Sequence, residues 1–229
     1  MTEFDQYSEC YKKTVESALP IFSPPLEFYA KQKANFLKTE INKSNSIGSL
    51  LELLNFGCGT GQIDGYLKEK CIKITGVDPS ESSLSYARES NPQNIYQKIP
   101  EDRLPEMGKK FDLIYASCVF HHIPPARHEA ILKDIQYHLK KGGKLIIFEH
   151  NPWNPITRWI TSRCKLDQNA RLIGAKALVE QIRKSGLQVV EKKYYLFLPL
   201  GGGIWNWVEK TILTRVPLGC QYFVVAQRQ

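Results

Sequence analysis

The sequence lacks several patterns that would place the chain outside ordinary globular proteins. No apolar run approaches the roughly 20 residues of a membrane-spanning helix. The N-terminal residues lack the basic start and apolar stretch of a signal peptide. Repeats and low-complexity tracts are also missing. With 42% hydrophobic and 24% charged residues, the composition is typical of a folded protein, and we expect a cytoplasmic, single-domain chain of 229 residues.

Cysteine pairs with a metal-binding or redox spacing are missing too. The six cysteines are Cys10, Cys58, Cys71, Cys118, Cys164 and Cys220. No two of them have CxxC spacing, and no Cys/His group has zinc-finger spacing. This favours free thiols in a reducing compartment, and it gives no reason to expect a bound metal.

The excess of positive charge lies in the last third of the chain. Residues 153–229 hold twelve basic and four acidic residues, which accounts for the whole formal excess of +8, whereas residues 1–152 are balanced. Such a region suggests an anionic partner, such as a phosphate, a lipid or a nucleic acid. A solvated basic surface is the alternative interpretation.

Short apolar runs alternate with helical patterns from residue 50 onward. The predicted strands are 50–56, 72–77, 95–97, 111–116, 144–149, 187–195 and 222–226. The predicted helices are 7–19, 26–38, 62–70, 82–90, 127–139 and 176–185. This alternation predicts an α/β fold, a Rossmann-like three-layer sandwich with a seven-stranded, mostly parallel sheet and one antiparallel strand. Ligands bind such sheets beyond the carboxyl ends of the strands, where the strand order reverses.

The first predicted strand runs into a glycine-rich loop, Asn55-Phe56-Gly57-Cys58-Gly59-Thr60-Gly61-Gln62. Glycines let the backbone adopt positive φ angles and let a ligand approach it closely. A dinucleotide fingerprint would place its third glycine at position 62, but here it comes one residue earlier. The second strand ends at Asp78, a carboxylate suited to both hydroxyls of a ribose. A structural turn for the loop and a helix cap for Asp78 are the alternatives.

In combination and in this order, four segments resemble the class I S-adenosylmethionine-dependent methyltransferases, particularly a branch similar to the ubiquinone- and menaquinone-biosynthesis enzymes. The segments are Leu53–Gly61, Gly76–Ser80, Phe111–Pro124 and Leu139–Asn151. The resemblance implies a donor-binding core at 48–150, preceded by N-terminal helices at 1–45. The acceptor side and the last strands then occupy 152–229.

The resemblance also assigns the donor site. The loop residues Asn55 to Gln62, with Gly57, Gly59 and Gly61 at their centre, pack against the methionine part of S-adenosylmethionine. Asp78 and Pro79 lie at its ribose. Glu101 or Asp102 contacts the adenine amino group, and Ser117 and Cys118 line the sulfonium end.

One residue departs from the family pattern. The family usually has Asp or Glu two residues before the first glycine, where this chain has Asn55. The neutral amide still forms hydrogen bonds but loses its charge attraction for the donor, so weaker donor binding is expected. A protein that binds the donor without catalysis is the non-enzymatic alternative.

Candidate catalytic residues follow the fourth and fifth predicted strands. His121 and His122 follow the fourth strand, and histidine titrates near neutral pH. Glu149 ends the fifth strand and is a further candidate base. Packing or capping is the alternative role for the histidines. Because methyl transfer requires an in-line arrangement, positioning alone supplies much of the rate.

The C-terminal region gives information about the chemical class of the methyl acceptor. Residues 204–215 show apolar side chains at helical spacing, with Trp205 and Trp207 at the start. Packing on its own domain is one reading of this inserted helix, and contact with a membrane surface or a greasy acceptor is the other. We expect methylation at oxygen or carbon of a small or lipid-like acceptor, with weak peripheral membrane association. RNA or protein methylation is the rival, although no nucleic-acid module is evident.

Overall fold

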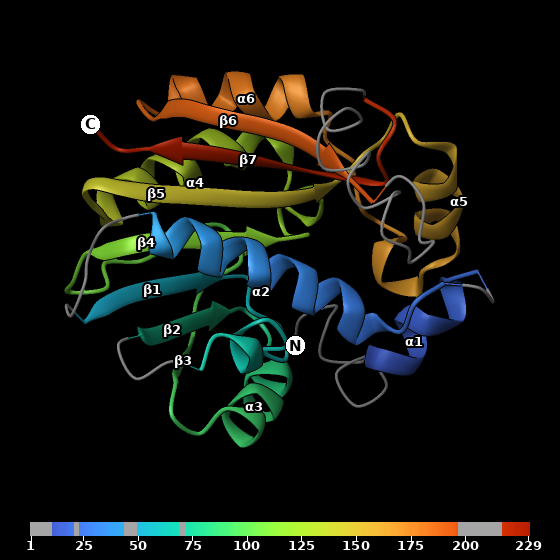
Figure 1. Cartoon of the computed structure of the whole chain (residues 1–229), viewed down its shortest axis with the longest axis horizontal. Helices are drawn as coiled ribbons and strands as arrows, with labels where there is room; N and C mark the ends of the chain where they lie inside the picture. Colours follow the sequence, from blue (N-terminus) through green and yellow to red (C-terminus); the bar gives the residue numbers. More distant parts are fainter. Residues whose placement is uncertain (1–10, 21–22, 44–49, 69–71, 197–216) are drawn as a thin grey trace.

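The computed structural model describes residues 11–20, 23–43, 50–68, 72–196 and 217–229. Its centre is a seven-stranded sheet with the strand order β3-β2-β1-β4-β5-β7-β6 (Figure 1). The strands are β1 (Leu51–Phe56), β2 (Ile72–Asp78), β3 (Ile95–Lys98), β4 (Phe111–Ser117), β5 (Leu139–His150), β6 (Gln188–Tyr195) and β7 (Gln221–Gln227). The α-helices are α1 (Tyr11–Ala18), α2 (Leu26–Asn42), α3 (Glu81–Ser90), α4 (Pro125–His138), α5 (Pro155–Arg163) and α6 (Ala175–Lys184). Three short 3-10 helices are η2 (Asp64–Tyr66), η3 (Phe120–His122) and η4 (Lys165–Asp167).

Helices cover both faces of the sheet, because its strands carry apolar side chains on both sides. The helix α2 crosses one face (Figure 1) and buries Ala30, Ala34, Leu37 and Ile41 against the sheet. On the other face, α4 and α6 contribute Ile131, Leu132, Ile135, Leu178 and Ile182 to the larger apolar cluster. Strands buried on both faces are typical of parallel sheets between helical layers.

The order of the strands in the sheet reverses between β1 and β4, two neighbouring strands that run parallel. The strand β7 alone runs antiparallel, to β5 on one side and to β6 on the other. The predicted Rossmann-like sandwich with seven strands and one antiparallel strand is therefore confirmed. The carboxyl ends of β1, β2, β4 and β5 meet at one edge of the sheet, where such folds bind ligands.

Two predicted elements differ from the structure. In place of a helix over 62–70, the described residues hold only the single turn η2, in which Leu67 N–H donates to the carbonyl of Asp64. The side chain of Asp64 points into the protein and is held there by three hydrogen bonds, which fixes this turn. The fifth strand begins at Leu139 rather than at residue 144, because Leu139 already pairs with Phe111 before an irregularity in the register.

Helix α5 has no counterpart among the predicted elements, and one predicted helix lies outside the described residues. Helix α5 begins after Asn154, whose side chain accepts a hydrogen bond from Thr157 N–H at 2.9 Å, as a helix-capping residue does. The predicted helix at 204–215, including Trp205 and Trp207, lies outside the described residues. No helix in the part of the chain that the structure describes is long and apolar enough to cross a membrane.

Candidate functional site

The glycine loop follows β1 at the point where the strand order reverses. Gly57 has a φ of +70°, and a side chain there would meet Val119 Cγ2 at 2.5 Å. Gly59 has a φ of +51°, but the space beside its Cα is open within 4 Å. Crowding and a positive φ therefore both select glycine at position 57, whereas at position 59 the positive φ alone favours it. The open space beside Gly59 leaves the backbone accessible to a ligand.

Asp78 ends β2 and holds the loop in place. One carboxylate oxygen accepts the N–H of Gly59 at 2.8 Å, and the other accepts the N–H of Ser80 at 2.9 Å. A carboxylate oxygen can accept more than one hydrogen bond, so the same group can also receive ribose hydroxyls. Asp78 is only 8% exposed, which limits competition from water. Its predicted role and its loop contacts are thus compatible.

The remaining predicted donor residues lie around this loop. Phe56 and Cys58 are buried, whereas Thr60, Gln62 and Pro79 are partly exposed. Glu101 and Asp102 are exposed in a turn beyond β3, and Asp102 lies 3.7 Å from Arg127. An adenine contact by either acid stays a prediction.

Ser117 and Cys118 lie at the carboxyl end of β4 beside a buried lysine that the sequence analysis missed. Lys33 of α2 is 7% exposed and donates to Ser117 Oγ at 2.8 Å and to Cys118 Sγ at 3.5 Å. Cys118 has a φ of +57°, a strained conformation for a side-chain-bearing residue. Burial opposes ionisation of this thiol, but His150 and Lys33 together lower the pKa of Cys118 to about 6.

Lys33 could have been found from the helical pattern. It lies on the same stripe as Ala30, Ala34 and Leu37, which are all buried against the sheet. A charged residue on an apolar stripe is uncommon and indicates a specific polar partner. The partner itself, at the tip of β4, has no signal in the local sequence.

Asn55, the departure from the family pattern, belongs to a buried polar network. Its side-chain amide donates to Asp64 at 2.7 Å, and the hydroxyls of Tyr96 and Tyr115 donate to the same carboxylate at 2.8 and 2.6 Å. Desolvation by burial raises the pKa of Asp64 to about 6, while the hydrogen bonds from the two tyrosines and Asn55 lower it. Asn55 itself carries no negative charge, but the side chain to which it donates, Asp64, is a carboxylate nine residues further along the chain.

The predicted catalytic residues His121 and Glu149 form a buried pair. His121 Nδ1 lies 2.5 Å from Glu149 Oε2, and the two side chains are 1% and 0% exposed. The other carboxylate oxygen accepts the backbone N–H groups of Val119 and Phe120 at 3.0 and 2.8 Å. Burial opposes its ionisation, but His121 and the hydrogen bonds lower the pKa of Glu149 to about 2. Glu149 is thus a fixed anion that orients His121 and is a poor base at neutral pH.

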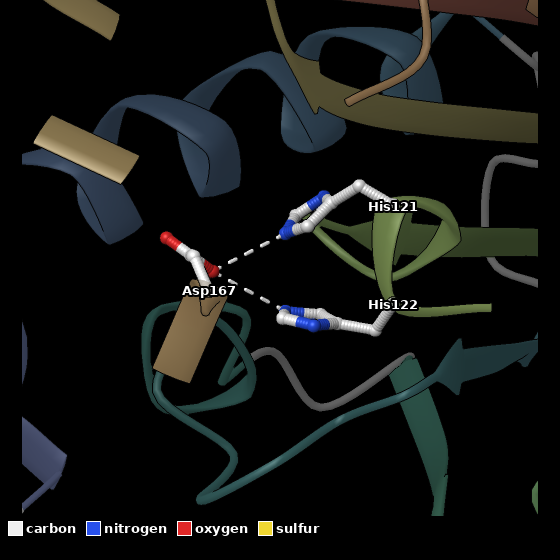
Figure 2. A group of neighbouring side chains, drawn as sticks. All are labelled: His121, His122 and Asp167. Carbon is white, nitrogen blue, oxygen red and sulfur yellow. Dashed lines mark ion pairs between the residues drawn. The ribbon is translucent and has the colours of Figure 1, made fainter. Parts of the chain in front are cut away.

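His122 lies beside His121 and faces the same acid (Figure 2). The Nε2 atoms of both histidines are 3.5 Å from Asp167 Oδ1, which comes from η4, a segment some 45 residues away along the chain. Burial and the neighbouring His121 lower the pKa of His122 to about 4. Asp167 was missed, because nothing in the local sequence distinguishes it from a surface acid.

Known proteins are similar to this chain in sequence and in fold. Residues 54–147 match the methyltransferase domain family. An uncharacterised methyltransferase of Synechocystis is 33% identical over 105 residues, which cover 45% of this chain and 49% of the relative. A ubiquinone biosynthesis O-methyltransferase of Ruegeria pomeroyi is 25% identical over 199 residues, covering 80% of this chain and 76% of the relative. The chain spans about half the length of the first two curated relatives that it matches.

A solved structure shares the whole fold. It is an S-adenosylmethionine-dependent methyltransferase from Thermotoga maritima, described as a possible histamine N-methyltransferase. Its TM-score is 0.67 at 22% identity, and the match covers 99% of this chain and 98% of that one. The match of residues 54–147 to the methyltransferase domain and the shared fold together support a class I S-adenosylmethionine-dependent methyltransferase.

Proposed function

We propose that the protein transfers the methyl group of S-adenosylmethionine to a small or lipid-like acceptor and releases S-adenosylhomocysteine. The observation that carries this proposal is the glycine loop, whose accessible Gly59 backbone is bonded to Asp78 at the strand-order reversal. This arrangement brings a backbone surface for the methionine part and a carboxylate for the ribose to one edge. The charge at Asp64 contributes to the attraction of the cationic donor in place of an acid at position 55.

The chemistry requires alignment more than acid–base catalysis. The acceptor atom, the methyl carbon and the sulfur must lie in line, and holding them so supplies much of the rate. A good general base has a pKa near the working pH. His122, with a pKa of about 4, is neutral but weakly basic, and Glu149, with a pKa of about 2, is weaker still. Neither residue therefore suits proton removal from an acceptor hydroxyl by itself.

The acceptor class is proposed as an amphipathic molecule methylated at oxygen or carbon. The Ruegeria relative is named for O-methylation in ubiquinone biosynthesis. In this chain an apolar patch lies on and beside α5, where Trp153, Ile156 and Trp159 are 73%, 45% and 45% exposed. Arg158 and Arg163 belong to the same helix. Exposed tryptophans beside basic residues suit a surface of anionic lipids.

Donor binding is tested by calorimetry with S-adenosylhomocysteine. Replacement of Asp78 by alanine should weaken binding by about 1–3 kcal/mol, the scale of hydrogen bonds to a charged group. The matched control is Asp112→Ala, which also removes a carboxylate that accepts a backbone N–H, but at the opposite end of the strands. Absence of binding by the wild type, or equal losses in both variants, would contradict the proposed donor site.

Acceptor class is tested by liposome co-sedimentation and by labelled methyl transfer to cell extracts. A Trp153→Ala, Trp159→Ala double variant should lose binding to anionic liposomes, and neutral liposomes should bind neither protein. The matched control replaces Tyr86 and Tyr137, two exposed aromatic residues on α3 and α4. If the wild type ignores anionic liposomes, a soluble acceptor is the better proposal; label in RNA or protein would replace the lipid-like acceptor altogether.

A further inference from the structure

His121, His122 and Asp167 bring together three groups that commonly bind metal ions. One ligand atom from each residue lies within 4.8 Å of the other two. The two contacts to Asp167 Oδ1 are 3.5 Å long. Two ligand atoms that each lie 2.0–2.1 Å from a tetrahedral zinc ion are separated by about 3.4 Å. The two contacts to Asp167 therefore match the spacing of neighbouring ligands in a coordination sphere.

His121 has an unsatisfied nitrogen aimed at this point. Its Nε2 is buried and makes no hydrogen bond among the described residues, since 3.5 Å to Asp167 is too long for a good one. Its Nδ1 faces Glu149, so in the neutral ring that a metal ion requires the proton lies on Nδ1 and the lone pair on Nε2. A carboxylate behind a histidine is the usual support of a metal ligand, because it orients the ring and makes it more basic.

The charges of the cluster also favour a cation. Glu149 and Asp167 bring two carboxylates into a buried site, with side chains 0% and 11% exposed. A divalent cation in the cluster is attracted by both carboxylates, because the protein interior screens charges only weakly. The position is also held from the backbone, because Arg171 N–H donates to the carbonyl of His121 at 2.7 Å and so ties the segment after η4 to the histidine turn.

We propose that His121, His122 and Asp167 bind a divalent transition-metal ion of the Zn²⁺ or Fe²⁺ type, with an open position for an acceptor oxygen. Two imidazoles and one carboxylate suit these ions better than Mg²⁺ or Ca²⁺, which prefer oxygen ligands alone. Three protein ligands are typical of catalytic sites, where water or substrate takes the next position. The site is reachable from solvent, since the side chains of His122 and Asp167 are 20% and 11% exposed.

The role of the ion rests on the proposed methyl transfer. An ion that holds an acceptor hydroxyl makes it lose its proton to water more readily. The oxygen lone pair then forms the bond to the methyl carbon while the sulfur–methyl bond breaks. The electron pair of that bond stays on sulfur, which becomes the neutral thioether. The ion thus makes the acceptor oxygen more reactive without a side-chain base.

The site lies next to the donor loop. Val119 directly precedes η3, which carries both histidines, and its side chain fills the space beside Gly57. The same Val119 donates its N–H to Glu149. A metal-bound acceptor would therefore lie at the edge of the sheet that the donor loop also occupies.

The experiment measures metal binding apart from activity. Chelator-treated protein is titrated with Co²⁺, followed by visible absorption and calorimetry, and then challenged with Zn²⁺. We expect one Co²⁺ per chain, displaced by Zn²⁺, with bands of nitrogen and oxygen ligands and no thiolate charge-transfer band. His122→Gln and Asp167→Asn should each weaken binding at least about tenfold, and Glu149→Gln should weaken it about 10–100-fold, as loss of a supporting carboxylate does.

The control is His138→Gln, which removes a buried histidine on α4 that contacts Met107 N–H rather than the cluster. It should bind Co²⁺ as the wild type does. S-adenosylhomocysteine affinity is measured on every sample, both as a fold check and because donor binding without Co²⁺ binding refutes the metal site alone. Failure of the wild type to bind Co²⁺, a thiolate band, or wild-type Co²⁺ affinity in both His122→Gln and Asp167→Asn would each overturn the proposal.

Discussion

The buried carboxylate of Asp64 should make the stability of the protein depend on pH in a particular direction. The pKa of Asp64 is about 6 in the folded protein, against 3.8 for an ordinary aspartate. Because the folded-state pKa is the higher one, the stabilising contribution is present in full below 3.8 and is lost as the pH rises through 6. A displacement of this size corresponds to about 3 kcal/mol of unfolding free energy.

The perturbation is Asp64→Asn, which keeps the shape of the side chain and an oxygen that accepts the Tyr115 hydroxyl. Urea unfolding of both proteins should be followed from about pH 4 to pH 7.5. The stability of the variant relative to the wild type should rise by up to about 3 kcal/mol over this range, with most of the change below pH 6.

The result that refutes this reasoning is a stability difference that does not change with pH. Asp112→Asn serves as the matched control, because Asp112 is partly exposed and paired with Lys140 at 2.8 Å. It should not reproduce the rise. A rise in both variants would point to a general effect of net charge rather than to burial of Asp64.

Three further variants test the site. Gly57→Ala should cost about 1–3 kcal/mol of stability in urea unfolding, and Val119→Ala should recover part of it; an undisturbed single variant would contradict the crowding. Lys33→Met should raise the pKa of the Cys118 thiol, because it removes a cation 3.5 Å from the sulfur, and an unchanged pH profile of Cys118 alkylation would disprove their coupling. His122→Gln should lower turnover at least about tenfold with donor affinity retained, because it removes a proposed metal ligand, and an unchanged turnover would argue against a role for the ion in catalysis.

The sheet and the donor loop could be predicted from the sequence because their signals are local. Apolar runs identify buried strands directly, and the positive φ angles of Gly57 and Gly59 depend on the glycines themselves. Asp78 follows a strand whose end can be located from the same pattern. The physical chemistry of these features acts between neighbours in the chain.

The rest of the site depends on contacts between distant segments. Asp167 meets His121 only because η4 folds back across the carboxyl end of β4. Lys33 meets Cys118 across 85 residues of chain. The turn at Asp64 replaces a predicted helix because its partners Tyr96 and Tyr115 come from β3 and β4. A local pattern contains no information about such partners.

The two outer strands of the sheet, β3 and β6, affect whether molecules associate through their sheet edges. An unpaired sheet edge can recruit the edge of another molecule, and proteins block this with short or charged outer strands. One edge here is β3, which has only four residues. The other is β6, whose central residues include Glu191, Lys192 and Lys193, with Glu191 and Lys193 forming an ion pair. The short β3 offers few groups for pairing, and a strand that pairs with β6 would have to desolvate its charges. Both edges therefore resist the growth of a continuous intermolecular sheet.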